Sequence, residues 1–118
     1  MNTNDIITLN TFEDIKNLDV DNKTSVIFCS LSFCQPCKII YPKFEEFSKR
    51  GAFKDINFCK ITMDELEDDN DESEIKSILN LEGKKYPQVV FLQQSQVLYQ
   101  LEYSNFEQEF ENIMLLFI

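Results

Sequence analysis

The segment SVIFCSLSFCQPCKIIYPKFEEF, residues 25–47, decides the fold of this chain. Its first part, residues 25–31, is apolar and β-branched, which predicts a buried strand. Apolar residues then recur at helical spacing, so a helix follows the strand. Cys34 lies at the N-terminus of that helix, where unpaired N–H groups and the helix dipole stabilise a thiolate. Pro36 is tolerated in the first turn, and Cys37 shares a helix face with Cys34, so the two can form a disulfide.

The remaining segments alternate between strand and helix patterns. We expect a strand at 6–9, a helix at about 11–18 capped by Asn10 or Thr11, a strand at 57–62, a helix face from Ile75 ending near Gly83, a hairpin of 88–92 and 97–103, and a last helix opened by a Ser104–Glu107 capping box. This order predicts a three-layer α/β/α sandwich with a mixed central sheet. We interpret residues 1–118 as one domain with an acidic insertion at about 64–74.

Composition excludes several classes of protein. With 118 residues and 43% hydrophobic content, the chain fits a globular domain with a sizeable core. No apolar segment approaches the length of a membrane span, and the N-terminus lacks the pattern of a signal peptide, so we expect no membrane association and a cytoplasmic, reducing location. Nucleic acid is not an expected partner, because the net charge is −10.

Most of the excess negative charge belongs to one run. Residues 64–74 contain eight acidic residues and no basic one, which leaves 13 acidic against 11 basic residues elsewhere. We interpret this run as a solvated loop and helix start. Docking to a basic partner is the first alternative. Calcium binding is a weaker one, because Asp68-Asp69-Asn70-Asp71 lacks the alternating ligands and the glycine of the usual loop.

Cys29, Cys34, Cys37 and Cys59 also match the spacing of plant-type iron–sulfur ferredoxins. A cluster needs a loop around its sulfurs, whereas Cys29 lies in a strand and a helix starts at Cys34. We therefore do not favour iron–sulfur or zinc ligation. Cys29 and Cys59 are expected on adjacent parallel strands, as buried thiols rather than a regulatory disulfide. A Cys34–Cys37 disulfide closes too short a loop to add much stability, so this pair is better explained as a redox couple.

The segment Phe33-Cys34-Gln35-Pro36-Cys37-Lys38 resembles the Trp-Cys-Gly-Pro-Cys-Lys signature of the thioredoxin family. Pro42 lies where thioredoxins kink the active-site helix. The segment Tyr86-Pro87-Gln88-Val89-Val90-Phe91 is similar to the one that opens with their cis-proline, and Lys60 matches a lysine that often lies behind their active site. The resemblance covers about residues 6 to 118 and depends on the order of elements as much as on identity.

The resemblance implies a thiol–disulfide oxidoreductase, active in redox homeostasis and electron transport, without cofactor or metal. Cys34 would attack a substrate disulfide and Cys37 would resolve the mixed disulfide. Disulfide-containing proteins would be the substrates, a reductase or glutathione the electron donor, and the chain a monomer or weak dimer. A binding or adaptor module with little turnover is the alternative. The residues expected to contact substrate are Phe33, Gln35, Pro36, Tyr86 and Pro87, with a cis Tyr86–Pro87 bond, and Lys38 and Lys60 are expected to support the cysteines.

The chain also departs from the family pattern. Phe28 stands where thioredoxins usually carry a buried aspartate that accepts the proton of the second thiol. Without it, deprotonation of Cys37 must depend on water, on Lys60 or on the mixed-disulfide sulfur. Phe33 replaces the usual tryptophan and Gln35 the glycine between the cysteines, and the docking loop near residues 102–104 has no glycine, so substrate preference is not transferred from the family.

Three further expectations concern the surface. Lys84 and Lys85, together with Lys38, would add positive potential near Cys34, unless they are ordinary solvated lysines. Leu115, Leu116 and Ile118 extend the apolar surface of the last helix. We interpret them chiefly as packing against the sheet, with a dimer or partner surface as the alternative.

Overall fold

A mixed sheet organises the molecule, and the computed structural model describes residues 5–117 of it. Within this range the strand order is β1-β3-β2-β4-β5, with β1, β2 and β3 parallel and β4 antiparallel to both β2 and β5. The strands are β1 (Ile7–Thr8), β2 (Ser25–Ser30), β3 (Asn57–Thr62), β4 (Gln88–Gln93) and β5 (Gln96–Glu102). The predicted order of elements and the mixed sheet are confirmed.

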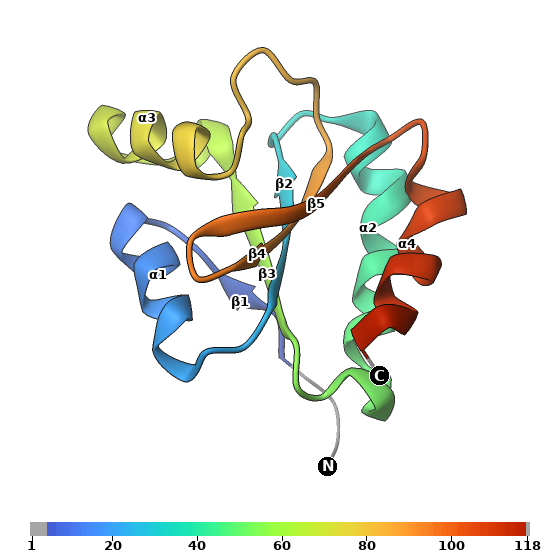
Figure 1. Cartoon of the computed structure of the whole chain (residues 1–118). Helices are drawn as coiled ribbons and strands as arrows, with labels where there is room; N and C mark the ends of the chain where they lie inside the picture. Colours follow the sequence, from blue (N-terminus) through green and yellow to red (C-terminus); the bar gives the residue numbers. More distant parts are fainter. Residues whose placement is uncertain (1–4, 118) are drawn as a thin grey trace.

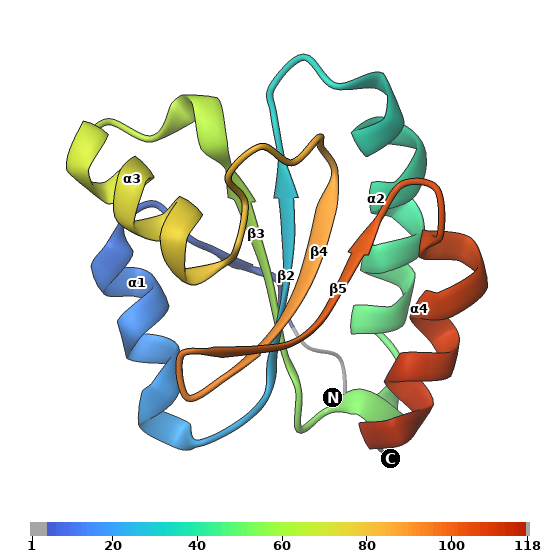
Figure 2. The same ribbon diagram turned by 45° about the horizontal axis from the view of Figure 1, so that its top comes forward.

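Helices cover both faces of the sheet (Figure 1). One pair, α1 and α3, lies on one side, and the other pair, α2 and α4, lies on the opposite side, as the rotated view in Figure 2 also shows. The helices are α1 (Phe12–Asn17), α2 (Gln35–Ser48), α3 (Asp69–Ile78) and α4 (Phe106–Met114). The predicted three-layer α/β/α sandwich is therefore correct.

The two faces of the sheet bury separate clusters, because side chains alternate along each strand. The α2/α4 face contains an aromatic cluster that includes Phe28, Phe44 and Phe110. The α1/α3 face contains a mainly aliphatic cluster that includes Ile61 and Leu79. Each face is closed by the apolar side of its helices.

Strand register gathers three chain segments at one edge of the sheet. Cys29 pairs with Ile61 on the parallel strand β3 and with Gln88 on the antiparallel strand β4. The carboxyl ends of β2 and β3 therefore lie beside the start of β4. The loop after Ser30, which leads to α2, begins at this edge.

Local hydrogen bonds define the starts of α1 and α3. Thr11 caps α1 in a capping box with Asp14, as one of the two predicted caps. Asp68 caps α3, and its carboxylate accepts hydrogen bonds from the N–H groups of Asn70 and Asp71. The acidic run thus forms the short 3₁₀ helix η3 (Met63–Glu65), a connection and the first turns of α3, where acidic residues suit the positive end of the helix dipole.

Several predicted boundaries were wrong. The first strand is shorter than expected, and α3 ends at Ile78, before the backbone turns through left-handed conformations at Asn80 and Gly83. The predicted Ser104 capping box does not form. Asn105 is the N-cap residue of α4, and its side chain accepts a hydrogen bond from the Glu102 N–H at 2.9 Å instead.

The end of the chain also differs from the expectation. Leu115 and Leu116, in the short helix η4 (Leu115–Phe117), are exposed rather than packed on the sheet. Phe117 provides the packing in their place, stacked on Phe91 with a centroid separation of 5.8 Å. The expectation for Ile118 lies outside the described residues.

Candidate functional site

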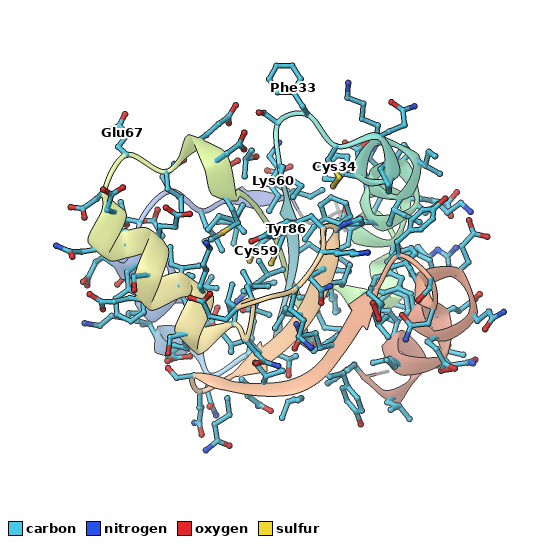
Figure 3. The ribbon with its side chains drawn as sticks, turned by 90° about the horizontal axis from the view of Figure 1, so that it is seen from above. Phe33, Cys34, Cys59, Lys60, Glu67 and Tyr86 are labelled. Carbon is cyan, nitrogen blue, oxygen red and sulfur yellow. A yellow bond between two sulfur atoms is a disulfide. The ribbon has the colours of Figure 1, made fainter. Side chains whose placement is uncertain are left out.

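The cysteine pair lies where β2 passes into α2. Cys34 is the N-cap residue of α2, Gln35 is the first helical residue and Pro36 follows in the first turn. Figure 3 looks onto this end of the molecule and shows Cys34 near the loop that carries Phe33. The sequence folds this way because a buried strand ends at Ser30 and Pro36 is compatible with a helix start. The predicted position of Cys34 at the helix N-terminus is correct.

The geometry of the pair suits reversible disulfide formation. Cys34 and Cys37 form a disulfide with a Cα–Cα distance of 5.2 Å, within the usual range for such bonds. The Cys37 N–H donates a hydrogen bond to the Cys34 Sγ at 3.3 Å. After reduction, this N–H and the helix dipole would favour the thiolate of Cys34 over that of Cys37.

A cysteine that attacks disulfides of other proteins is expected to be exposed, but for Cys34 this expectation is wrong. In this disulfide state Cys34 is 8% exposed and Cys37 is 5% exposed, because both sulfurs pack into the aromatic cluster below α2. Phe33 is the prominent residue here, with 93% of its surface exposed, and Figure 3 shows its ring pointing away from the molecule. The position of Cys34 at the helix end, rather than its exposure, therefore distinguishes it from Cys37.

Tyr86 and Pro87 lie at the same edge of the sheet. Their peptide bond is cis, as predicted. Pro87 directly precedes Gln88, which pairs with Cys29, so it lies beside Ser30 at the start of the active-site loop. Pro87 is buried, whereas Tyr86 is half-buried and contacts both core clusters. Two segments that are about fifty residues apart in the sequence thus meet near the cysteine pair.

Phe28 lies beside the cysteine pair and lines the same pocket as both cysteines. It is 2% exposed, and its ring lies 5.2 Å from that of Tyr41 and 5.4 Å from that of Phe44. Lys60 pairs with Phe28 across the parallel strands, and its Nζ lies 5.7 Å from the centroid of the Tyr41 ring. Burial raises the pKa of the Tyr41 hydroxyl, with a smaller contribution from the nearby Glu45.

The structure brings together only some of the predicted site residues. Cys34, Cys37, Lys38 and Lys60 line one pocket. Lys84 borders a different, smaller pocket with Gln88 and Glu102. The substrate-contacting roles of Phe33, Gln35, Pro36, Tyr86 and Pro87 and the supporting roles of Lys38 and Lys60 stay predictions.

Sequence reasoning missed a contact that holds the active-site loop. The Ser32 N–H donates a hydrogen bond to the Asp64 carboxylate at 2.9 Å, and the Ser32 hydroxyl donates a second one to it. These bonds lower the pKa of Asp64, the hydroxyl bond most. Asp64 lies in η3, four residues after Lys60. The only signal in the sequence was the position of Asp64 just past the strand that neighbours β2.

We expect Asp64→Ala to lower disulfide exchange by about three- to tenfold, because the loop before Cys34 loses two hydrogen bonds and the sulfur is held less accurately. Asp64→Asn keeps an oxygen acceptor for the Ser32 N–H and should retain most of the activity. Glu65→Ala, which removes a neighbouring charge, is the matched control. Steady-state rates of disulfide exchange, measured at constant ionic strength, check this prediction. Equal, small effects of Asp64→Ala and Glu65→Ala would contradict the role of Asp64.

The other two cysteines are buried thiols in the α1/α3 cluster, as expected. Cys29 and Cys59 lie on the adjacent parallel strands β2 and β3. Burial raises the pKa of the Cys59 thiol from 9.0 to about 12, with a smaller contribution from Asp21. Burial also raises the pKa of Cys29, helped by the nearby Cys59. Both thiols are therefore protonated at neutral pH and poor nucleophiles.

We expect iodoacetamide to label Cys34 first in the native, reduced protein and to spare Cys29 and Cys59 until the chain is unfolded. Peptide mass spectrometry after timed labelling measures this directly.

The raised pKa values of Cys29 and Cys59 also predict that the stability of the protein depends on pH. The native state keeps thiol protons that the unfolded chain loses, so the contribution of these thiols to stability is complete below pH 9.0 and declines toward pH 12. Native labelling of Cys59 at the rate of Cys34 would contradict the burial argument.

The structure argues against the iron–sulfur alternative. Cys34 and Cys37 belong to the cluster under α2, whereas Cys29 and Cys59 belong to the cluster on the opposite face of the sheet. Among residues 5–117, no group of three or more His, Cys, Asp or Glu side chains is placed to hold a metal ion. The same range contains no helix of sufficient length and apolar character to cross a membrane.

The cysteine pair forms a disulfide at the start of the helix that follows the central strand. In an α/β sandwich of this topology, such a pair defines a class of redox proteins. The Thioredoxin family model matches residues 5–115. The chain therefore belongs to the thioredoxin family.

The sequences of curated relatives match part of this chain. Thioredoxin from Coprinus comatus is 33% identical over 70 residues, covering 54% of this chain and 66% of the relative. Thioredoxin from Mycoplasmoides gallisepticum is 36% identical over 72 residues, covering 61% of this chain and 62% of the relative. The matched part of the chain thus spans just under two thirds of the length of these relatives.

Solved structures share the whole fold. Malassezia sympodialis thioredoxin has a TM-score of 0.75 at 21% identity and covers 97% of this chain and 95% of its own. Fasciola hepatica thioredoxin has a TM-score of 0.75 at 20% identity, covering 96% and 100%. A structure of a ferredoxin:thioredoxin reductase and thioredoxin f2 complex matches with a TM-score of 0.67 at 18% identity, covering 96% and 98%. These likenesses establish the fold.

Proposed function

We propose that this protein is a thiol–disulfide oxidoreductase whose Cys34 and Cys37 thiols exchange with disulfides of other proteins and become the Cys34–Cys37 disulfide. The observation that carries the proposal is the pair itself: two cysteines at disulfide distance, with the first at a helix N-cap and accepting the Cys37 N–H. Membership of the thioredoxin family supports the same activity.

The proposed reaction has two steps. The Cys34 thiolate attacks one sulfur of a substrate disulfide, forming a mixed disulfide and releasing the other substrate sulfur as a thiolate. The Cys37 thiol then loses its proton and attacks Cys34, which releases the second substrate sulfur and forms the Cys34–Cys37 disulfide. The protein loses two electrons and the substrate gains them. The two protons lost by the cysteines balance those taken up by the product thiols.

The surroundings of the pair assign roles to its neighbours. Phe33, which projects from the loop, and Gln35 and Pro36, in the first turn of α2, would contact the substrate from one side. Tyr86 and Pro87 would contact it from the facing edge of the sheet. Because Phe28 provides no carboxylate, the proton of Cys37 would leave through water, through Lys60 or to the departing sulfur.

We further propose that a reductase or glutathione returns the disulfide to the dithiol, in a reducing and cytoplasmic setting, as part of redox homeostasis and electron transport. The likeness to a chain in the solved complex of ferredoxin:thioredoxin reductase and thioredoxin f2 supports a protein donor. Two buried cysteines left as free thiols are consistent with a reducing compartment. We propose a monomer or weak dimer, in which the exposed Leu115 and Leu116 would provide a contact.

Insulin reduction with dithiothreitol tests the proposal. The protein should accelerate precipitation of the reduced insulin chains at micromolar concentration, and Cys34→Ser should return the rate to that of dithiothreitol alone. Cys29→Ala, which removes a cysteine outside the pair, is the control for folding and should keep most of the activity. A well-folded protein with no acceleration would instead support the binding or adaptor module.

A further inference from the structure

A pocket of about 360 Å³ opens beside the disulfide. Both cysteines, Phe28, Tyr41, Lys38 and Lys60 contribute to its wall. None of the residues expected to contact protein substrates, namely Phe33, Gln35, Pro36, Tyr86 and Pro87, lines it. Its volume falls at the small end of the range for small-molecule sites, about 300–1,000 Å³. The disulfide thus has a second accessible side, with room for about one substituted ring.

The floor of this pocket is aromatic. Phe28 and Tyr41 meet edge to face, with their ring centroids 5.2 Å apart, and Phe44 lies behind both. Such a wall favours a flat apolar body, which gains both burial and ring contacts. Leu31 and Pro42 extend the apolar lining.

Two cations without acidic partners face this apolar lining. The part of the chain that the structure describes has no ion pair that involves Lys38 or Lys60. Lys60 is half-buried and pairs with Phe28 across β2 and β3, so a carboxylate at position 28 would neutralise it, but Phe28 cannot. No acidic side chain lines the pocket. An unpaired ammonium beside an apolar surface attracts an anion more strongly than one in open water.

Most of the negative charge of the protein lies elsewhere. Helix α3, which carries three acidic residues in its first turn, lies on the opposite face of the sheet from α2, as Figure 2 shows. The Asp64 carboxylate accepts hydrogen bonds from the Ser32 N–H and hydroxyl and does not line the pocket. The pocket therefore keeps its local positive charge although the protein carries a net charge of −10.

We propose that this pocket binds small organic anions that combine an aromatic ring with a carboxylate, and that it thereby selects small disulfides of that chemistry as substrates. The ring lies against Phe28 and Tyr41, and the carboxylate lies near Lys60 and Lys38. The substrate part of this inference rests on the proposed oxidoreductase function, whereas the binding part does not. In the exchange, the Cys34 and Cys37 thiols give two electrons and two protons to the disulfide, which leaves as two thiols.

The binding part is tested on the oxidised protein, where no exchange occurs. Titration of the ¹⁵N-labelled protein with 2-nitrobenzoate should give saturable shifts of backbone signals at residues 28, 41 and 60. Lys60→Met should weaken binding by about fivefold, as loss of one partly desolvated charge contact implies. Lys54→Met, which removes an exposed lysine outside the pocket, should leave the affinity unchanged. Uncharged 2-nitrobenzamide should bind more weakly than the anion.

The substrate part is tested on the reduced protein with two chromogenic disulfides. One is 5,5′-dithiobis(2-nitrobenzoate), which carries carboxylates, and the other is uncharged 2,2′-dithiodipyridine. Lys60→Met and Lys38→Met should each lower kcat/KM for the charged disulfide, relative to kcat/KM for the uncharged one, by about three- to fivefold. A change in the reactivity of the thiols would alter both values and leave this ratio unchanged. An unchanged ratio, or shifts that do not saturate, would overturn the inference. Failure of the proposed function would look different, because neither disulfide would be reduced while binding persisted.

Discussion

Cys37→Ser is expected to stop catalytic turnover and to leave the substrate attached to Cys34. The Cys34 thiolate keeps its stabilising position at the N-cap of α2, so the first attack proceeds. Serine cannot displace the substrate sulfur, so the mixed disulfide has no internal route to release. We expect insulin reduction to fall by about 100-fold or more.

The trapped species gives this prediction its sharpest measurement. Mass spectrometry without reducing agent should show a covalent adduct at Cys34 in Cys37→Ser and no adduct in the Cys34→Ser, Cys37→Ser double variant. Cys59→Ala is the control, because Cys59 lies in the cluster on the opposite face of the sheet. This variant should neither trap substrate nor lose turnover. If adducts formed at Cys37 in Cys34→Ser as fast as they form at Cys34 in Cys37→Ser, the assigned roles of the two cysteines would be contradicted.

Phe28→Asp is expected to have two large and opposite effects. The change removes a ring packed against Tyr41 and Phe44 and buries a carboxylate, so the free energy of unfolding should fall by about 3–5 kcal/mol. The same carboxylate would lie beside Cys37 and next to Lys60 and would accept the thiol proton. Release of the mixed disulfide should then quicken by about tenfold or more near neutral pH, whereas the initial attack should change little.

Phe28→Asn is the matched control, because it has nearly the volume of the aspartate but no ionisable group. Both variants should lose similar stability in urea titrations, and only Phe28→Asp should accelerate release in stopped-flow traces. Equal release rates in the folded wild-type, Asn and Asp proteins would mean that water already removes the proton efficiently, or that the Lys60 ammonium already stabilises the Cys37 thiolate enough. The missing aspartate would then have no kinetic consequence in this chain.

The sequence predicted the cysteine site well because its signals are local. The strand at residues 25–31 and the helix after it follow from side-chain periodicity, and Cys34 falls at their junction. The same local reasoning failed at α4, where Ser104 and Glu107 have the spacing of a capping box. Asn105 became the cap because the turn from β5 holds its side chain against the Glu102 N–H. Competing turn contacts of this kind are not visible in a spacing pattern.

The length of α3 shows the same limit. Ile75, Leu79 and Leu81 are all buried in one cluster, so the sequence pattern identified the right inward residues. It placed the end of the helix near Gly83, but Asn80 already takes a left-handed conformation with φ of 58°. Leu81 reaches the core from the turn instead of the helix. Burial alone therefore did not define the helix end.

By itself, the sequence determined the order of elements, the two-sided burial of the central strands and the redox pair at a helix N-terminus. These features depend on neighbours within a few residues, where propensity, periodicity and capping act. Only the tertiary structure decided that Phe28 pairs with Lys60, that Asp64 holds Ser32 and that the disulfide packs into the aromatic cluster. The first two contacts join residues 32 positions apart, and the aromatic cluster brings the disulfide together with residues from several strands and helices. Strand register and close packing of the whole molecule decide these contacts.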